Sequence, residues 1–202
     1  MNSNKIKILH IITSLSQGGA QRVLNELTLS TLDTFDHHIY VLISKKGEEM
    51  RNKFNKEGIK IYQFSNKNLY EFFLSLKSLI FFAIKEKPNL IQTWLYHSDL
   101  ISSILSPLGI PILWNIRHSN STKKYTPKHR LITIKLCSFL SYLIPIKILS
   151  CSKIGIKYHK NIGYSDRFLY VPNGTSREKK FLKKEKLIEQ KKIYTIGFFH
   201  RF

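Results

Sequence analysis

The sequence predicts an α/β protein built on a doubly wound, Rossmann-like parallel sheet. Two observations support this prediction. Short runs rich in β-branched residues alternate with stretches of helical periodicity, which is the pattern of parallel strands joined by crossover helices. The first of these runs, Ile6–Ile12, is apolar nearly throughout, as expected when helices cover both faces of a sheet.

The predicted elements follow one another in regular order. Ile6–Ile12 is the first strand, and Ala20–Leu32 is the first helix because Ala20, Leu24 and Leu27 recur at helical spacing on one face. Then come a strand at His38–Ile43, a helix at Glu48–Lys56 ended by Gly58, a strand at Ile59–Phe64, a helix within Leu69–Lys85, a strand at Leu90–Trp94 and a helix at Ser98–Ser106. The last are a strand at Ile112–Ile116, a helix at Lys128–Leu143, a strand at Ile148–Cys151, a helix at Lys153–Asn161 and a strand at Phe168–Val171.

These elements place residues 1–175 in one domain. Segment 176–192 is strongly basic with few apolar positions, which favours a solvated linker or an exposed helix. Segment 193–202 turns apolar again and predicts the first strand of a second domain, because a lone strand without a covering helix does not form a domain.

The chain carries a formal net charge of +20, from 33 Lys and Arg against 13 Asp and Glu. This excess favours anionic partners, whether nucleic acid, an acidic membrane face or phosphorylated small molecules, and the charge alone does not choose among them. No nucleic-acid-binding motif is present, so no nucleic-acid partner is expected. The apolar segments Phe72–Ile84 and Leu131–Leu149 are interrupted by lysines, which predicts a cytoplasmic protein that associates at most peripherally with a membrane.

The two cysteines, Cys137 and Cys151, lie in apolar stretches and form no CxxC pair. They indicate buried thiols in a reducing compartment, not a disulfide scaffold or a zinc site.

A glycine-rich loop, Ser16-Gln17-Gly18-Gly19, follows the first predicted strand and opens the first helix. Ligands of open parallel sheets bind beyond the carboxyl ends of the strands, where free helix amides favour a phosphate. Gly18 and Gly19 would let the backbone approach such a ligand closely, although a tight turn alone would also account for them. The loop lacks the third glycine of the dinucleotide-binding fingerprint.

Polar side chains occur at comparable positions after two later strands. His97 and Asp99 come after the fourth strand, and Arg117 and His118 after the fifth. Imidazole, carboxylate and guanidinium groups at such an edge can orient sugar hydroxyls or bind anions, although each histidine taken singly also fits a surface or packing role. No nucleophile elbow, HExxH or Walker loop occurs, which disfavours hydrolase and nucleotidase functions.

The string HIITSLSQGGAQRVL, residues 10–24, resembles the opening strand, glycine loop and helix of the retaining glycosyltransferase family 4, whose loop usually reads GGAER. Gln21 stands where that family commonly has glutamate. The resemblance continues, in the right order and spacing, through KPNLIQTWLYH at 87–97, WNIRHS at 114–119, SCS at 150–152, VPNG at 171–174 and IGFFHRF at 196–202.

This resemblance implies the amino-terminal half of a GT-B fold, in which two Rossmann-like domains face each other across a cleft. It implies transfer of a sugar from a nucleotide-diphosphate donor with retention, without a bound metal or other cofactor. The site residues it implies are His118 as the catalytic residue contacting the transferred sugar, Gly18, Gly19 and Arg201 at the donor phosphates, and His97, Asp99, Arg117 and Asn173 as acceptor or sugar contacts.

The implied partners are a nucleotide-sugar donor, a glycan or lipid-linked acceptor and an anionic membrane surface. The expected function is the amino-terminal portion of a hexosyltransferase of bacterial surface polysaccharide biosynthesis, such as that of lipopolysaccharide. Because the family grips the donor mainly with its second domain, the alternative is a catalytically inactive, truncated domain that still binds an acceptor or a membrane.

Overall fold

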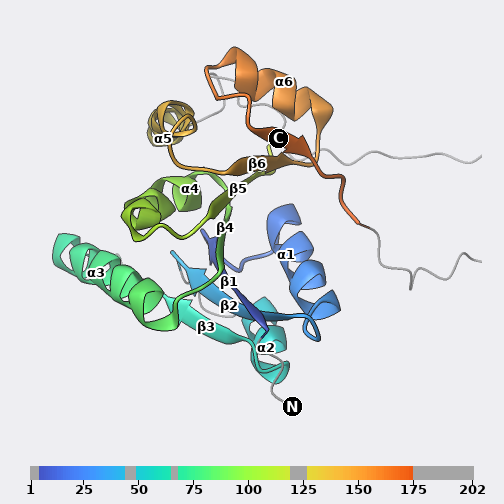
Figure 1. Ribbon diagram of the computed structural model, residues 1–202, viewed down its shortest axis with the longest axis vertical. Coiled ribbons are helices and arrows are strands. Elements are labelled where there is room, and N and C mark those ends of the chain that lie inside the picture. Colours follow the sequence, from blue (N-terminus) through green and yellow to red (C-terminus); the bar gives the residue numbers. More distant parts are fainter. Residues whose placement is uncertain (1–4, 44–48, 65–67, 119–126, 175–202) are drawn as a thin grey trace, which may run out of the picture.

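The computed structural model describes residues 5–43, 49–64, 68–118 and 127–174. Their strands form one seven-stranded sheet in the order β3-β2-β1-β4-β5-β6-β7, and each pair of neighbours is parallel. This confirms the predicted Rossmann-like fold class (Figure 1). The strands are β1 (Ile6–Ile12), β2 (Phe35–Val41), β3 (Lys60–Gln63), β4 (Leu90–Trp94), β5 (Ile112–Ile116), β6 (Lys147–Ser150) and β7 (Phe168–Tyr170).

Helices cover both faces of the sheet, as a doubly wound fold requires (Figure 1). One face carries α1 (Gly19–Ser30) and α2 (Glu49–Lys56). The other carries α3 (Leu69–Glu86), α4 (Tyr96–Ser102), the 3₁₀ helix η1 (Ser103–Leu108), α5 (Lys128–Leu140) and α6 (Lys153–Asn161). Strands β2 and β3 are added on one side of β1, and strands β4 to β7 on the other, so the order of strand addition switches between β1 and β4.

Each face of the sheet has its own apolar core. Leu24 of α1 and Phe54 of α2 pack with Ile12, Ile39 and Trp94 on one face. On the other face, side chains of α3, α4, η1 and α5 form a larger core, which includes Leu79, Tyr96, Leu105, Trp114 and Cys137. Burying a large apolar side chain contributes about 1.5–3 kcal/mol, so these two cores fix the strand register on which the carboxyl edge depends.

Several predicted boundaries differ from the observed ones. The first helix ends at Ser30 and not at Leu32, ends of β2, β3, β6 and β7 shift by one or two residues, and three further differences are informative. β2 begins at Phe35 and not at His38, because buried His37 bonds to His10 and so belongs to the sheet. The predicted helix at 98–106 starts earlier, at Tyr96, and continues as the 3₁₀ helix η1, which contains Pro107. α5 ends at Leu140 and not at Leu143, since Pro145 disfavours a helical conformation for the residue before it.

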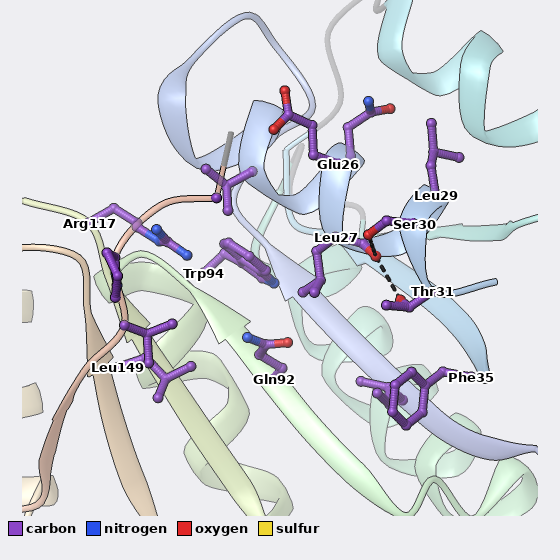
Figure 2. A pocket seen from close by; sticks show the side chains of 16 residues that line it. Glu26, Leu27, Leu29, Ser30, Thr31, Phe35, Gln92, Trp94, Arg117 and Leu149 are labelled. Carbon is purple, nitrogen blue, oxygen red and sulfur yellow. Dashed lines mark hydrogen bonds between the residues drawn. The ribbon is translucent and has the colours of Figure 1, made fainter. Parts of the chain in front are cut away.

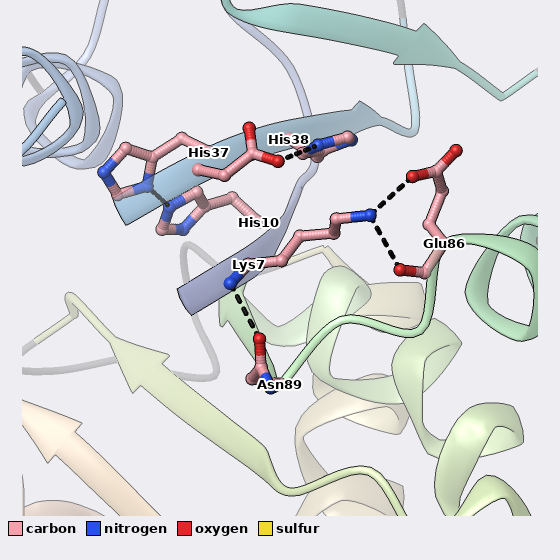
Figure 3. A network of polar contacts seen from close by, with 7 residues as sticks. Lys7, His10, His37, His38, Glu86 and Asn89 are labelled. Carbon is pink, nitrogen blue, oxygen red and sulfur yellow. Dashed lines mark hydrogen bonds and ion pairs between the residues drawn. The ribbon is translucent and has the colours of Figure 1, made fainter. Parts of the chain in front are cut away.

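The amino edge of the sheet is held to α3 through Lys7 (Figure 3). Its ammonium group donates to the backbone carbonyl of Glu86 at 2.8 Å and pairs with the carboxylate of Glu86 at 2.7 Å, and its backbone N–H donates to Asn89 Oδ1 at 2.8 Å. A cation at the carboxyl terminus of α3 also suits the helix dipole. These contacts fix the start of β1 against the end of α3 and the turn after it.

Among the described helices, none combines the length and the apolar character that crossing a bilayer requires.

Candidate functional site at the carboxyl edge

The carboxyl ends of β1, β4, β5 and β7 lie on the same edge of the sheet, because all the strands are parallel. The glycine loop follows β1, His97 lies in α4 after β4, His118 follows β5, and Asn173 follows β7. Thr13 Oγ1 lies 3.4 Å from Ser98 Oγ, which joins the end of β1 to α4. The sheet therefore brings Gly19 and His118 to one edge, as the sequence predicted.

The glycine loop is exposed and opens into α1. Gly18 caps the helix in an extended conformation, with φ at 179°, and no side chain caps the first turn. A Cβ atom added to Gly19 would meet nothing within 4 Å, so packing does not require glycine there. Buried Gln21 donates from Nε2 to the carbonyl of Ser14 at 3.0 Å and holds the loop in place. A glutamate carboxylate at this position could not donate that bond while ionised.

His118 stacks on the ring of Tyr96, with ring centroids 5.6 Å apart and an interplanar angle of 18°. Tyr96 is itself fixed from below, because its hydroxyl lies 2.7 Å from His159 Nε2. His159 Nδ1 lies 2.6 Å from the carbonyl of Gly155 and must carry the proton, so Nε2 accepts and Tyr96 donates. Burial lowers the pKa of His118, and nearby Arg130 lowers it further. His118 is thus a neutral, oriented imidazole near pH 7.

His97 lies beside α5, where its ring centroid is 6.1 Å from that of His129. Burial, Arg130 and His129, in that order, lower the pKa of His97. The edge therefore holds two half-buried neutral imidazoles, His97 and His118, near the same arginine. Neutral imidazoles can both donate and accept hydrogen bonds, which suits sugar hydroxyls.

Asp99 lies below the surface of the edge and is fully buried. Its Oδ1 accepts a hydrogen bond from the hydroxyl of Thr93, and no described residue bonds to its Oδ2. Burial raises the pKa of Asp99 to about 8. In this conformation the carboxyl group does not reach a ligand, so the sugar contact predicted for Asp99 would require the edge to open.

Arg117 points to the opposite face of the sheet from its neighbour His118, as successive residues at a strand end do. Its guanidinium lies over the Trp94 ring, 5.3 Å from the centroid, and donates to Asn173 Oδ1. Burial lowers the pKa of Arg117. The sequence predicted Arg117 and Asn173 separately, and the structure bonds them to each other.

An open cavity of about 830 Å³ begins at Arg117 and runs along the sheet beside α1 (Figure 2). Its wall is mostly apolar, and Glu26 of α1 lies on the far side from Arg117. Asn25 is a further polar residue of the lining. The lining comes from α1, from strands β1, β2, β4 and β6, and from the segment after β7, so the cavity extends from the guanidinium toward the amino ends of β1 and β2. The other lining residues are Ile8, Val23, Leu27, Leu29, Ser30, Thr31, Phe35, Gln92, Trp94, Leu149, Val171, Pro172 and Gly174.

Sequence reasoning missed two features of this edge. Tyr96 and Trp94 form the platforms beneath His118 and Arg117. Strand alternation would have placed these two residues on the same face, and they lie in different cores because the chain leaves β4 through Leu95 and begins α4 at Tyr96. Asn115 is buried on β5, and neither its amide nitrogen nor its amide oxygen has a hydrogen-bond partner among the described residues. An asparagine within the apolar run ILWNI was the available signal.

Arg201, predicted at the donor diphosphate, lies outside the described residues, as do segments 176–192 and 193–202. Within the described ranges, no three His, Cys, Asp or Glu side chains gather as metal ligands would.

No protein-family model and no curated protein matches the sequence. Among solved structures, the chain is similar to Anabaena Alr3699/HepE in complex with UDP and glucose, with a TM-score of 0.69 at 14% identity over 84% of this chain and 45% of that chain. The chain has the fold of a GT-B glycosyltransferase domain.

Two further structures extend this likeness. The lipopolysaccharide outer core galactosyltransferase WaaB gives a TM-score of 0.60 at 17% identity, covering 84% of this chain and 46% of that chain. UDP-N-acetylglucosamine 2-epimerase from Rickettsia bellii gives 0.60 at 13% identity, covering 84% and 45%. The chain spans slightly less than half the length of these proteins. At such identities the likeness establishes the fold, and activity has to be argued from the site.

Proposed function

We propose that this chain is the amino-terminal, acceptor-side portion of a retaining glycosyltransferase of family 4, which transfers a sugar from a nucleotide-diphosphate donor to a glycan or lipid-linked acceptor. The proposed setting is bacterial surface polysaccharide synthesis. The observation that carries the proposal is the shared carboxyl edge, where an uncapped glycine-opened helix follows β1 and an oriented neutral imidazole follows β5, with only β4 between these two strands. Similar GT-B structures bound to UDP and UDP-glucose support it.

Each group has a chemical task in this proposal. The amides at the start of α1, exposed by Gly18 and Gly19, face the donor diphosphate and stabilise its charge. His118, neutral and held flat by Tyr96, bonds to hydroxyls of the transferred sugar. Arg117 and Asn173 contact the acceptor side, and His97 adds a second imidazole there. Arg201 steadies the leaving diphosphate, and no metal or other cofactor is needed.

Binding tests the site without requiring turnover. Titration of the chain with UDP and UDP-glucose, followed by amide NMR, should shift the signals of Gly18, Gly19 and His118. Gly19→Ala should weaken binding several-fold although it clashes with no protein atom, because the new methyl lies where the phosphate approaches. Ser30→Ala at the other end of α1 is the control and should bind normally. Shifts confined to another part of the sheet would overturn the site.

Turnover separates the enzyme from the alternative, a catalytically inactive module that binds an acceptor or membrane. The chain is incubated with labelled UDP- and GDP-sugars and a bacterial membrane extract. Because the family grips the donor mainly with its second domain, transfer is expected when such a domain accompanies this portion, with the anomeric configuration of the donor kept in the product, as NMR coupling constants of the glycoside would show. His118→Ala should lower the rate about 10²-fold or more. Binding of UDP without transfer would favour the inactive module instead.

The chain is also similar to a UDP-N-acetylglucosamine 2-epimerase, and the turnover experiment tests this alternative as well. Conversion of UDP-N-acetylglucosamine to its 2-epimer without an acceptor would replace the transferase proposal by an epimerase.

A further inference from the structure

Two helices of one layer expose several large apolar side chains. α3 and α5 lie in the same layer, on either side of α4 and η1, on the sheet face opposite α1 (Figure 1). Phe73 and Phe81 of α3 are 60% and 66% exposed, and Phe139 of α5 is 69% exposed. We call this surface the α3–α5 face. Its exposed apolar residues are Leu69, Tyr70, Phe73, Leu74, Phe81 and Ile84 of α3, and Ile132, Leu136, Phe139, Tyr142 and Leu143 of α5 and the turn after it.

The exposed apolar residues follow helical spacing. On α3 the positions 70, 73, 74, 77, 81 and 84 recur at three- and four-residue intervals, and all but Lys77 are apolar. On α5, Ile132, Leu136 and Phe139 do the same. The inner sides of both helices are already buried in the core. Each helix therefore has apolar side chains on the side buried against the sheet and also on the side exposed to solvent. Exposed apolar patches of this kind indicate an interaction surface.

Lysines surround these apolar stripes. Lys77, Lys85 and the cap residue Lys87 are exposed on α3, and Lys128 and Lys135 are exposed on α5. None of these five lysines belongs to an ion pair between described residues, which include Lys7–Glu86, Arg22–Glu26 and Lys160–Asp166. Of the two glutamates of α3, Glu86 pairs with Lys7. The α3–α5 face thus combines exposed aromatic and aliphatic side chains with uncompensated positive charge.

Charge decides which partner suits this surface. A second copy of the chain would set lysines against lysines, and segment 175–192 of the same chain is itself strongly basic. An anionic lipid surface complements both features, because its headgroups attract lysines while its interface takes in Phe, Tyr, Leu and Ile side chains. Long lysine side chains can reach the headgroups while their methylenes cover apolar surface.

We infer that the α3–α5 face docks the protein on an anionic membrane surface, with α3 and α5 lying flat on it and the carboxyl edge of the sheet left open at its side. The docking does not depend on the proposed transferase activity, and it specifies where a lipid-linked acceptor would meet the site.

Vesicle co-sedimentation of the full chain tests the inference. Binding to phosphatidylcholine vesicles containing phosphatidylglycerol should exceed binding to pure phosphatidylcholine by about tenfold or more. It should weaken strongly between about 0.1 M and 1 M salt, as the Debye length shortens from roughly 10 Å to 3 Å. Equal binding to both vesicle types, or no binding to either, would overturn the inference.

Matched variants locate the surface. Phe73→Ser with Phe139→Ser should reduce vesicle binding at least tenfold, and Lys77→Glu with Lys135→Glu should do the same. Lys53→Glu with Lys56→Glu changes two exposed lysines of α2, on the opposite face of the sheet, and should leave binding within about twofold of the parent. Equal losses from both lysine pairs would show charge attraction without a defined face, and would overturn the assignment.

Three controls keep the outcomes distinct. Because the substituted side chains are exposed, thermal melting should show that every variant remains folded. If light scattering finds a dimer that Phe73→Ser converts to a monomer, the face binds a second copy and the membrane inference fails. Titration with UDP in the absence of vesicles reports on the carboxyl edge separately, so loss of docking and loss of donor binding are told apart.

Discussion

At the scale of the residue, the carboxyl edge depends on one buried carboxyl group. Asp99 accepts a hydrogen bond from Thr93, and its pKa is raised to about 8 by burial. Between pH 4 and 8 the folded protein therefore keeps a proton that the unfolded chain releases at its ordinary pKa of 3.8. Linkage then requires the contribution of Asp99 to stability to fall as pH rises through this window.

Asp99→Asn should remove this pH dependence while keeping the shape of the side chain and the acceptor for Thr93. We expect the variant to gain roughly 4 kcal/mol relative to the parent between pH 4 and pH 7 and to match it near pH 4. Urea unfolding of both proteins across this range measures the difference. A constant offset between the two curves would mean that Asp99 is ionised in the folded protein.

The buried histidines His10 and His37 bond to each other (Figure 3). They belong to a chain of hydrogen bonds in which every donor points in the same direction. The indole N–H of Trp94 can only donate a hydrogen bond, and it donates to His10 Nδ1 at 3.4 Å. His10 Nε2 then donates to His37 Nδ1 at 3.0 Å, and His37 Nε2 donates to Thr31 Oγ1 at 2.9 Å. The hydroxyl of Thr31 in turn donates a hydrogen bond to the backbone carbonyl of Leu27. Both imidazoles are neutral in this chain.

His37→Leu should cost about 1–3 kcal/mol, because His10 Nε2 is left buried without an acceptor. His10→Leu with His37→Leu should cost less than the sum of the single changes, since both ends of that bond are then removed. The pKa of His10 lies well below its ordinary 6.5, chiefly through burial. The parent should therefore lose stability as pH falls below about 6.5, and the double variant should lose less. Denaturation curves of the parent, the two single variants and the double variant measure these costs. If the cost of the double change equals the sum of the two single costs, the two histidines do not bond to each other as described.

At the scale of the element, α3 ends in a conformation that its sequence does not favour. Its cap residue Lys87 has φ 46° and ψ 59°, in the left-handed region, and its N–H donates to the carbonyl of Ala83 at 3.0 Å. Lys87→Gly should raise the melting temperature by about 2–4 °C, because glycine adopts this conformation without about 1 kcal/mol of strain. Lys77→Gly, in the exposed middle of α3, removes the same charge and should lower it. A lower melting temperature for both would show that the cap carries no strain.

How far the sequence predicts the structure differs between elements and sites. Strand β5 and helix α6 were predicted to the residue, because apolar runs and helical spacing reflect burial directly. The helix start at Tyr96 was missed because the turn before it places Leu95 at φ 74°, a left-handed conformation that no leucine signals in advance.

Site contacts are harder to predict, because they depend on strand order. The sequence placed Arg117, His118, Asp99 and Asn173 on one edge but did not separate their environments. Arg117 and Asn173 meet only because β5, β6 and β7 are neighbours, and Asp99 is buried only because α4 packs between the sheet and α5. Register and helix packing are set by the whole fold, so single motifs do not contain this information.

At the scale of the whole molecule, the excess positive charge opposes folding. The 33 Lys and Arg outnumber the 13 Asp and Glu, so the compact state holds like charges closer together than the unfolded chain does. Salt shortens the range of this repulsion, with a Debye length of about 30 Å at 0.01 M and about 10 Å at 0.1 M. Salt also weakens the attraction between Lys7 and Glu86, which lowers stability. This single pair contributes little compared with the repulsion among the many positive charges of the surface.

The melting temperature should therefore rise by a few degrees as NaCl is raised from about 0.01 M to 0.1 M, in the absence of lipid. The same salt should weaken docking through the α3–α5 face, so the two charge effects have opposite signs and are separable in one protein. Lys53→Gln with Lys56→Gln lowers the net charge on α2, away from that face, and should reduce the salt-induced rise without changing docking. A melting temperature that falls with salt would mean that local ion pairs outweigh the repulsion, and that the net charge is not what limits stability.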